Sequence, residues 1–375
     1  MVAFALASGI ALIPSARIPE EEMMRRSTVC LVVGLLLSAG SAFAQGGGAP
    51  AKAKATAPEI PFDSVPNFFK LPAGLYMGEG VGVATNSKGH VFVYTRSGET
   101  RLFEFDQNGT FVKEFGAGSY GMAFAHAVRV DKDDNVWAVD EGTNIIMKFN
   151  PEGKILMVLG KRPDPLEQLS LTPGGGQYSG ANKPYSFHRQ TDVAWDAQQN
   201  IFVSDGYGDS RVVKYDKSGR FIKAVGTRGD GPLQFSTPHA IAVDAKGIVY
   251  VADRGNSRIV VLDNDLNQKA VYDHVGAPWA VCISNGPHQY LYSSNSFPTG
   301  NNFDQAPTTG EVYKMELDGT VLGRFGKAGH ALKEFSSIHQ MDCRNPDELY
   351  VAEITAFRVQ KIILRPQPTR SSGGK

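Results

Sequence analysis

Apolar and polar residues alternate with a period of two along much of the chain, and short polar turns interrupt the alternation. Between Pro238 and Leu262 this pattern predicts three strands, which are Ala240 to Val243, Ile248 to Ala252 and Arg258 to Leu262. Polar turns such as Asp244 to Gly247 separate them. Three short strands of this kind form a meander, which cannot bury its faces alone.

The same unit recurs, with variation, along the chain. Six units begin near Val81, His126, Thr191, His239, Trp279 and His339. Each full unit carries four strand signals. Four-stranded units of roughly forty residues, repeated six times, are typical of a β-propeller. The sequence therefore predicts an all-β fold, a six-bladed propeller over residues 61–366 with a polar tail at 367–375.

The last unit stops after its third strand, at Val359 to Leu364. Because an unpaired edge would leave the ring open, we expect an N-terminal segment around Val65 to Leu71 to supply the fourth strand. Insertions at residues 161–190 and 296–310 interrupt the repeat. Long insertions are usually binding loops or disordered segments, and it stays open whether the first covers a mouth of the central channel.

Residues 1–44 have the pattern of a leader. Basic residues precede an apolar run from Val29 to Leu37, and small residues end at Ala44. This pattern predicts a secretory signal peptide, a true start at Met23 or Met24, and an exported, periplasmic or secreted protein. The apolar run is too short to span a membrane. Residues 45–60, rich in Gly, Ala and Pro, are predicted to be a flexible linker.

The charge balance limits which binding partners are expected, and the cysteine content bears on whether a disulfide forms. The 38 basic and 38 acidic residues cancel, which gives no electrostatic reason to expect nucleic acid or an anionic membrane as a partner. We expect a monomer. Without the leader two cysteines remain, Cys282 and Cys343. A disulfide is possible, but neither the spacing nor the size of the chain demands one, so buried free thiols are favoured.

Three histidines share one position of the repeat. His126, His239 and His339 begin units two, four and six. Alternate blades of a six-bladed ring lie about 120° apart, so these side chains can point at one spot on the axis. Three imidazoles with an open fourth position are a ligand set of catalytic zinc. The alternative is that each histidine caps a strand and bonds a neighbouring carbonyl.

A second repeat position carries two arginines. The loop after the second strand holds Arg96 in unit one and Arg254 in unit four. Together they could clamp a carboxylate across the channel mouth. The equivalent position of unit three is Gly206, and Tyr207 stands next to it. A phenol beside a divalent metal and arginines ionises at lower pH and can act as a base. The alternatives are surface arginines and a packed turn tyrosine.

These units resemble NHL repeats. The order of motifs, with Thr-Asp-Val-Ala at 191–194, Ser-Asp-Gly-Tyr at 204–207 and Ala-Asp-Arg at 252–254, is similar to peptidyl-α-hydroxyglycine α-amidating lyase. The resemblance covers roughly residues 75–364. It implies a peptide or small-molecule substrate with a C-terminal carboxylate, and an amide and glyoxylate as products. The implied site residues are the zinc ligands His126, His239 and His339, the catalytic Tyr207, and the substrate-binding Arg96 and Arg254.

The chain also departs from the family pattern. The family has an aspartate directly after its third histidine, which helps to hold a structural calcium ion, whereas Gln340 stands here. A neutral amide weakens that site, although the backbone carbonyl of Val128 remains available to calcium. Arg101 competes with Arg96 for the role of first arginine. The alternative function is a non-catalytic NHL propeller that serves as a binding scaffold outside the cytoplasm.

Overall fold

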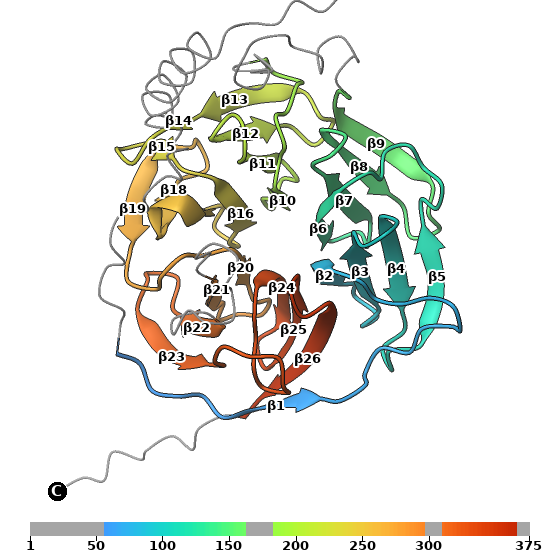
Figure 1. Ribbon diagram of the computed structural model, residues 1–375. Helices are drawn as coiled ribbons and strands as arrows, with labels where there is room; N and C mark the ends of the chain where they lie inside the picture. Colours follow the sequence, from blue (N-terminus) through green and yellow to red (C-terminus); the bar gives the residue numbers. More distant parts are fainter. Residues whose placement is uncertain (1–55, 163–182, 297–309, 366–375) are drawn as a thin grey trace, which may run out of the picture. The chain divides into compact units, whose positions relative to one another are not determined.

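The computed structural model describes residues 56–162, 183–296 and 310–365. The predicted leader, most of the predicted linker, the middle of both insertions and the predicted tail lie outside these ranges. The described residues form a six-bladed β-propeller, as the repeat predicts (Figure 1). In every blade a four-stranded antiparallel sheet runs outward from a central axis. Among the described residues, no helix has the length and apolar character needed to cross a membrane.

Blades one to three follow the chain from the innermost strand to the rim. Blade one comprises β2 (Gly80–Thr85), β3 (Val91–Thr95), β4 (Arg101–Phe105) and β5 (Phe111–Phe115). Blade two comprises β6 (Ala125–Val130), β7 (Val136–Asp140), β8 (Ile145–Phe149) and β9 (Ile155–Gly160). Blade three comprises β10 (Asp192–Trp195), β11 (Ile201–Asp205), β12 (Arg211–Tyr215) and β13 (Phe221–Val225).

Blades four and five repeat this order, and blade six ends with a strand from the N-terminal side. Blade four comprises β16 (Pro238–Val243), β17 (Val249–Asp253), β18 (Arg258–Leu262) and β19 (Gln268–Tyr272). Blade five comprises β20 (Val281–Ile283), β21 (Leu291–Asn295), β22 (Glu311–Met315) and β23 (Val321–Phe325). Blade six comprises β24 (Ile338–Asn345), β25 (Glu348–Glu353), β26 (Arg358–Leu364) and β1 (Phe62–Val65). Outside the blades, β14 (Thr227–Arg228) pairs with β15 (Gln234–Phe235), and η1 (Arg254–Asn256) is a short 3-10 helix.

The turns explain why the strands end where they do. In blade four the Asp244 carboxylate accepts the backbone N–H groups of Lys246 and Ile248, at 2.9 and 2.8 Å. Gly247 closes this turn with φ of +81°, a conformation that favours glycine. The equivalent Asp131 of blade two accepts bonds from the side chains of Asn135 and Trp137, at 3.0 Å each. Its oxygens are thus occupied by N–H donors, which accounts for an acidic turn without any metal.

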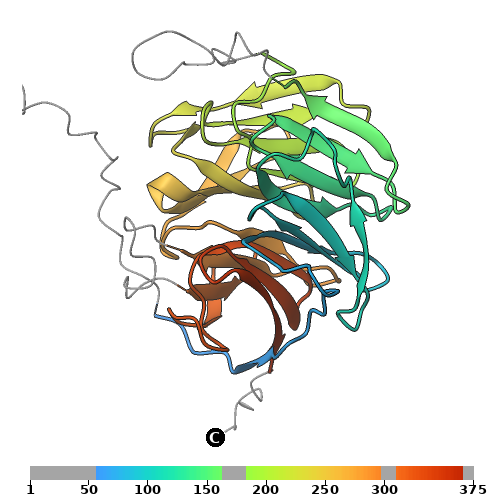
Figure 2. The same cartoon turned by 45° about the vertical axis from the view of Figure 1, so that its right-hand side comes forward.

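The ring closes through β1. This strand pairs antiparallel with β26, from Phe62 opposite Leu364 to Val65 opposite Lys361 (Figure 2, blue against red). The predicted position of the closing strand, around residues 65–71, was too far along the chain. Those residues are apolar for another reason, since Phe68, Phe69 and Leu71 pack on the cluster between blades six and one.

The core is divided into six clusters, and each cluster lies between two neighbouring blades. Every sheet thus buries both faces against its neighbours, which the isolated meander could not do. Because apolar burial is the main favourable contribution to folding, blade-to-blade packing holds the ring and fixes the direction of the inner strands.

A disulfide joins two of the blades. Cys282 on β20 and Cys343 on β24 are bonded, with their Cα atoms 6.1 Å apart. The preference for free thiols was therefore wrong. Their separation of 61 residues gives no sign of contact, and only the adjacency of the innermost strands of blades five and six brings them together.

Candidate metal centre and active site

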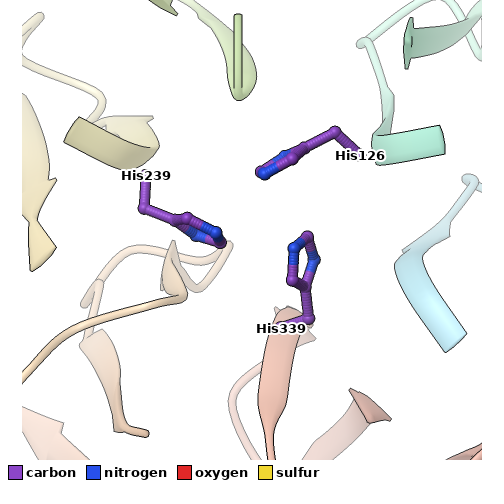
Figure 3. A group of neighbouring side chains, drawn as sticks. All are labelled: His126, His239 and His339. Atoms are coloured by element: carbon purple, nitrogen blue, oxygen red, sulfur yellow. The ribbon is translucent and has the colours of Figure 1, made fainter. Parts of the chain in front are cut away.

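His126, His239 and His339, called the tripod below, begin the innermost strands of alternate blades. At each of them the pairing with the next strand shifts register, between Ala125 and Ala127, Pro238 and Ala240, and Ile338 and Gln340. A bulge of this kind leaves one residue outside the ladder and redirects its side chain. Figure 3 shows the result, with three imidazoles converging on one point of the channel.

The tripod is compact and buried. Its ring centroids lie 4.5 to 4.7 Å apart, and one nitrogen from each ring lies within 4.8 Å of the other two. The three residues are 1 to 3% exposed. The structure thus brings together the three histidines that the repeat singled out, and they could form a metal site.

Each imidazole is held by a neighbouring blade. Every Nδ1 lies 2.6 to 2.7 Å from a backbone carbonyl, and the acceptors belong in turn to Thr191, Trp279 and Val81. Because a carbonyl only accepts, Nδ1 carries the proton and Nε2 keeps its lone pair, the arrangement found in metal-binding histidines. The expected alternative, a bond to a neighbouring carbonyl, is therefore also present, and it orients the tripod.

Electrostatics keep the imidazoles neutral. Burial is the main cause that lowers the pKa of all three rings well below 6.5. Nearby cations lower it further, chiefly Arg254 for His239 and Arg96 for His339, while His339 acts on His126. The Nε2 atom of His239 is buried without a hydrogen-bond partner in the described part of the chain. A neutral lone pair of this kind can bind a metal ion.

Tyr207 lies at the edge of the tripod. Its hydroxyl is 3.3 Å from Nε2 of His126. The turn that carries it needs both flanking glycines, since a Cβ on Gly206 would lie 2.1 Å from the Pro238 carbonyl oxygen. A Cβ on Gly208 would lie 2.1 Å from the His188 ring. Close packing, rather than a left-handed backbone, thus explains the glycines that bring the phenol to the tripod.

The pKa of Tyr207 reflects two opposing effects. Burial raises it above its usual value of 10.0, whereas the charges of Arg254, Arg96 and Arg189 lower it. Burial is the larger effect. The arginines alone therefore do not produce the lowering expected from the sequence, which also assumed a divalent metal beside the phenol.

The two predicted arginines both act on the site, in different ways. Arg254 stacks on the rings of Trp279 and Tyr207, at 4.5 and 5.5 Å from their centroids. Arg96 donates from Nε to Glu79 at 2.8 Å, and its charge lowers the pKa of His126 and His339. The competing Arg101 pairs instead with Glu99 and Glu114. Arg96 is therefore the arginine of blade one that belongs to the site.

Two further charged residues, Glu141 and Arg189, lie beside Arg96 and Tyr207. The sequence did not single them out. Glu141 lies 3.2 Å from Arg189 and 3.8 Å from Arg96, and its Oε2 is buried without a hydrogen-bond partner among the described residues. Arg189 lies over the Tyr207 ring at 4.5 Å and is about half exposed, at 51%. Glu141 could have been found, because it occupies the repeat position of the two arginines. Arg189 lies near the end of the first insertion, outside the repeat, and has no such marker.

Comparison with known proteins agrees with this architecture. The family model for the NHL repeat matches residues 235–262. The chain is thus a β-propeller that contains an NHL repeat. This propeller is 29% identical over 316 residues to a probable peptidyl-alpha-hydroxyglycine alpha-amidating lyase of Caenorhabditis elegans, covering 77% of this chain and 83% of that protein. It is 28% identical over 308 residues to NHL repeat-containing protein 3 of Mus musculus, covering 77% and 80%.

Among solved structures, the propeller is similar to virginiamycin B lyase from Staphylococcus aureus, with a TM-score of 0.53. The alignment covers 82% of this chain and all of that chain, at 10% identity. This likeness concerns the fold. The sequence comparison goes further, because this chain resembles a probable amidating lyase over 77% of its length.

Proposed function

We propose that the protein is a carbon–nitrogen lyase that cleaves a peptidyl- or N-acyl-α-hydroxyglycine into an amide and glyoxylate. The observation that carries this proposal is the tripod, whose three neutral imidazoles converge beside the Tyr207 hydroxyl. The similarity to an amidating lyase of Caenorhabditis elegans supports the reaction class.

We propose zinc as the metal. Three imidazole nitrogens with room for a fourth ligand suit catalytic zinc, and the buried Nε2 of His239 has no hydrogen-bond partner among the described residues. His126, His239 and His339 would hold the ion through Nε2, since their Nδ1 atoms bond carbonyls. When bound, zinc acts as a Lewis acid that makes an α-hydroxyl more acidic.

The protein residues then move one proton and hold one carboxylate. In its ionised form, which the charges of Arg254, Arg96 and Arg189 favour, the Tyr207 oxygen accepts the proton of the substrate α-hydroxyl, and a carbonyl forms as the C–N bond breaks. The bonding electron pair goes to nitrogen, and Tyr207 returns the proton there. The products are an amide and an aldehyde, so no oxidant is needed. Arg254, stacked beside Tyr207, and Arg96 bind the substrate carboxylate that leaves with glyoxylate.

We also propose that the protein works outside the cytoplasm. The leader pattern motivates this proposal, and the Cys282–Cys343 bond supports it, because disulfides persist in oxidising compartments. Antibody detection of the protein in the periplasmic and culture fractions tests it.

The test of the function uses Tyr207→Phe, which removes only the phenol oxygen. With N-benzoyl-α-hydroxyglycine as substrate, we expect kcat for glyoxylate release to fall by about 10²- to 10⁴-fold, with the zinc content of the protein unchanged. Tyr120→Phe is the matched control, because Tyr120 is 74% exposed. Full activity of Tyr207→Phe, or purified protein without metal, would argue for a binding propeller instead.

A further inference from the structure

Arg129 reaches across the central channel. It lies on the side of the tripod that faces away from Tyr207 and Glu141. It belongs to β6 in blade two, and it donates from Nε and Nη2 to the two carboxylate oxygens of Asp192 in blade three, at 3.0 and 2.5 Å. It also donates to the carbonyls of Val281 in blade five, at 3.2 Å, and Met341 in blade six, at 3.4 Å. One guanidinium thus connects four of the six blades.

Its charge is retained in spite of burial. The side chains of Arg129 and Asp192 are 13% and 1% exposed. Burial by itself would lower the pKa of Arg129, but the Asp192 carboxylate outweighs it and holds the pKa above its usual value. Asp192 is fixed in turn by the backbone N–H groups of Val193 and Ile241, at 2.9 and 3.2 Å. The Arg129 guanidinium is therefore a permanent positive charge, paired with the Asp192 carboxylate.

The oxygens around this guanidinium are those that a hard cation prefers. Calcium binds carboxylate and backbone carbonyl oxygens, and here one carboxylate and two carbonyls point at a cation that is part of the chain. The guanidinium satisfies these oxygens with its N–H donors.

Gln340, next to the tripod, does not offer a calcium ligand either. Its Oε1 accepts the backbone N–H groups of Val83 and Val128, at 2.9 and 3.2 Å. Its amide nitrogen is buried without a hydrogen-bond partner among the described residues, and an NH₂ group repels a cation. The calcium ion implied by the family resemblance therefore does not fit the residues present.

We propose that Arg129 is the built-in cation of the propeller axis, where it holds the blades together as a bound calcium ion would. On this proposal the protein binds a metal ion at the tripod and none on the axis beyond it. The proposal concerns stability and metal content, so it stands or falls separately from the lyase reaction.

The experiment compares melting temperatures in calcium-free buffer and with added CaCl₂. The wild-type protein should show no shift. Arg129→Met leaves the Asp192 carboxylate unpaired, so its melting temperature should fall by about 5 °C or more. CaCl₂ should restore part of that loss of stability, because calcium can bind the Asp192 carboxylate and the two carbonyls that Arg129 no longer contacts.

Lys148→Met is the matched control. Lys148 pairs with the buried Asp131 of the same blade at 3.0 Å, away from the axis. This variant should lose stability without any recovery in CaCl₂, because Asp131 already accepts bonds from Asn135 and Trp137.

Three outcomes would overturn the proposal. They are a wild-type protein that binds about one calcium ion per chain in equilibrium dialysis, an Arg129→Met variant as stable as wild type, and a variant that calcium does not rescue. If Arg129→Met fails to fold, the proposal is tested by the melting temperature of Arg129→Lys and by calcium binding of the wild-type protein in dialysis. Lysine keeps the charge, so Arg129→Lys should lose less stability than Lys148→Met and should not respond to calcium.

Discussion

The two halves of the central channel treat their ionisable groups in opposite ways. Toward the mouth, Nε2 of His239 and Oε2 of Glu141 are buried without hydrogen-bond partners among the described residues. In the other half, the Asp192 carboxylate is matched by Arg129, and Asp342 accepts both the N–H and the hydroxyl of Thr85 at 2.9 Å. Buried ionisable groups without partners cost free energy, and in this channel they mark the half that is prepared for a ligand.

This difference teaches how one channel can serve both stability and chemistry. The half that contains the Arg129–Asp192 pair holds the blades together. The Cys282–Cys343 bond adds a covalent link there, and the cavity between the strand ends measures only about 160 Å³. The other half leaves donors and acceptors in place for a metal ion and a substrate. Substitutions in the two halves should therefore have different effects.

The largest effect is expected from His239→Ala. The loss of one of three ligands should remove the bound metal and lower glyoxylate release by about 10³-fold or more. The stability of the metal-free protein should change less than in Arg129→Met, because His239 gives up one hydrogen bond, from Nδ1 to the Trp279 carbonyl, whereas Arg129 makes four bonds to three other blades. Metal analysis, activity and thermal unfolding of both variants check this prediction. If His239→Ala and Arg129→Met destabilise the protein equally, the two halves of the channel do not differ in their contribution to stability.

An intermediate effect is expected at acid pH. The tripod histidines have pKa values lowered well below 6.5 in the folded protein, mainly by burial. The unfolded chain therefore binds more protons below pH 6.5, and the free energy of unfolding of the metal-free protein should fall as the pH falls. Each histidine contributes at most about 1.4 kcal/mol per pH unit, and its stabilising effect is complete above pH 6.5.

The measurement compares the slope of unfolding free energy against pH for wild type and His239→Gln, both without metal. This comparison is needed because burial raises the pKa of Asp205 to about 7 and that of Asp253 to about 6, which acts in the opposite direction. The slope should be shallower in His239→Gln. Identical slopes would mean that the tripod is not buried in its neutral form.

The smallest effect is expected from Arg189→Gln. Arg189 lies over the Tyr207 ring and lowers the pKa of that phenol, so we regard it as a positioning residue. Its loss should reduce kcat/KM by about tenfold and move the acid limb of the pH profile of kcat, where Tyr207 loses its proton, to higher pH. Arg101→Gln, at an arginine that pairs with Glu99 and Glu114, should leave both unchanged. A lower kcat/KM with an unmoved pH profile would assign Arg189 to substrate binding alone.

Much of this architecture could be predicted from the repeat. Equivalent positions of a repeat lie at equivalent places in the ring, so the spacing of His126, His239 and His339 was enough to bring them together. Contacts between non-equivalent residues could not be found in this way. The Cys282–Cys343 bond, the Arg129–Asp192 pair and the stacking of Arg189 on Tyr207 depend on which blades meet and on where a side chain ends.

The closing strand β1 has a consequence for how the molecule is made. Asp63 and Arg365, at the two ends of the propeller, form an ion pair although they lie 302 positions apart in the sequence. β1 leaves the ribosome long before β26 does, and contacts of such long separation form slowly. Until β26 has been made, the nascent propeller is therefore an open arc with unprotected edges. A chain truncated before β26 cannot close the ring.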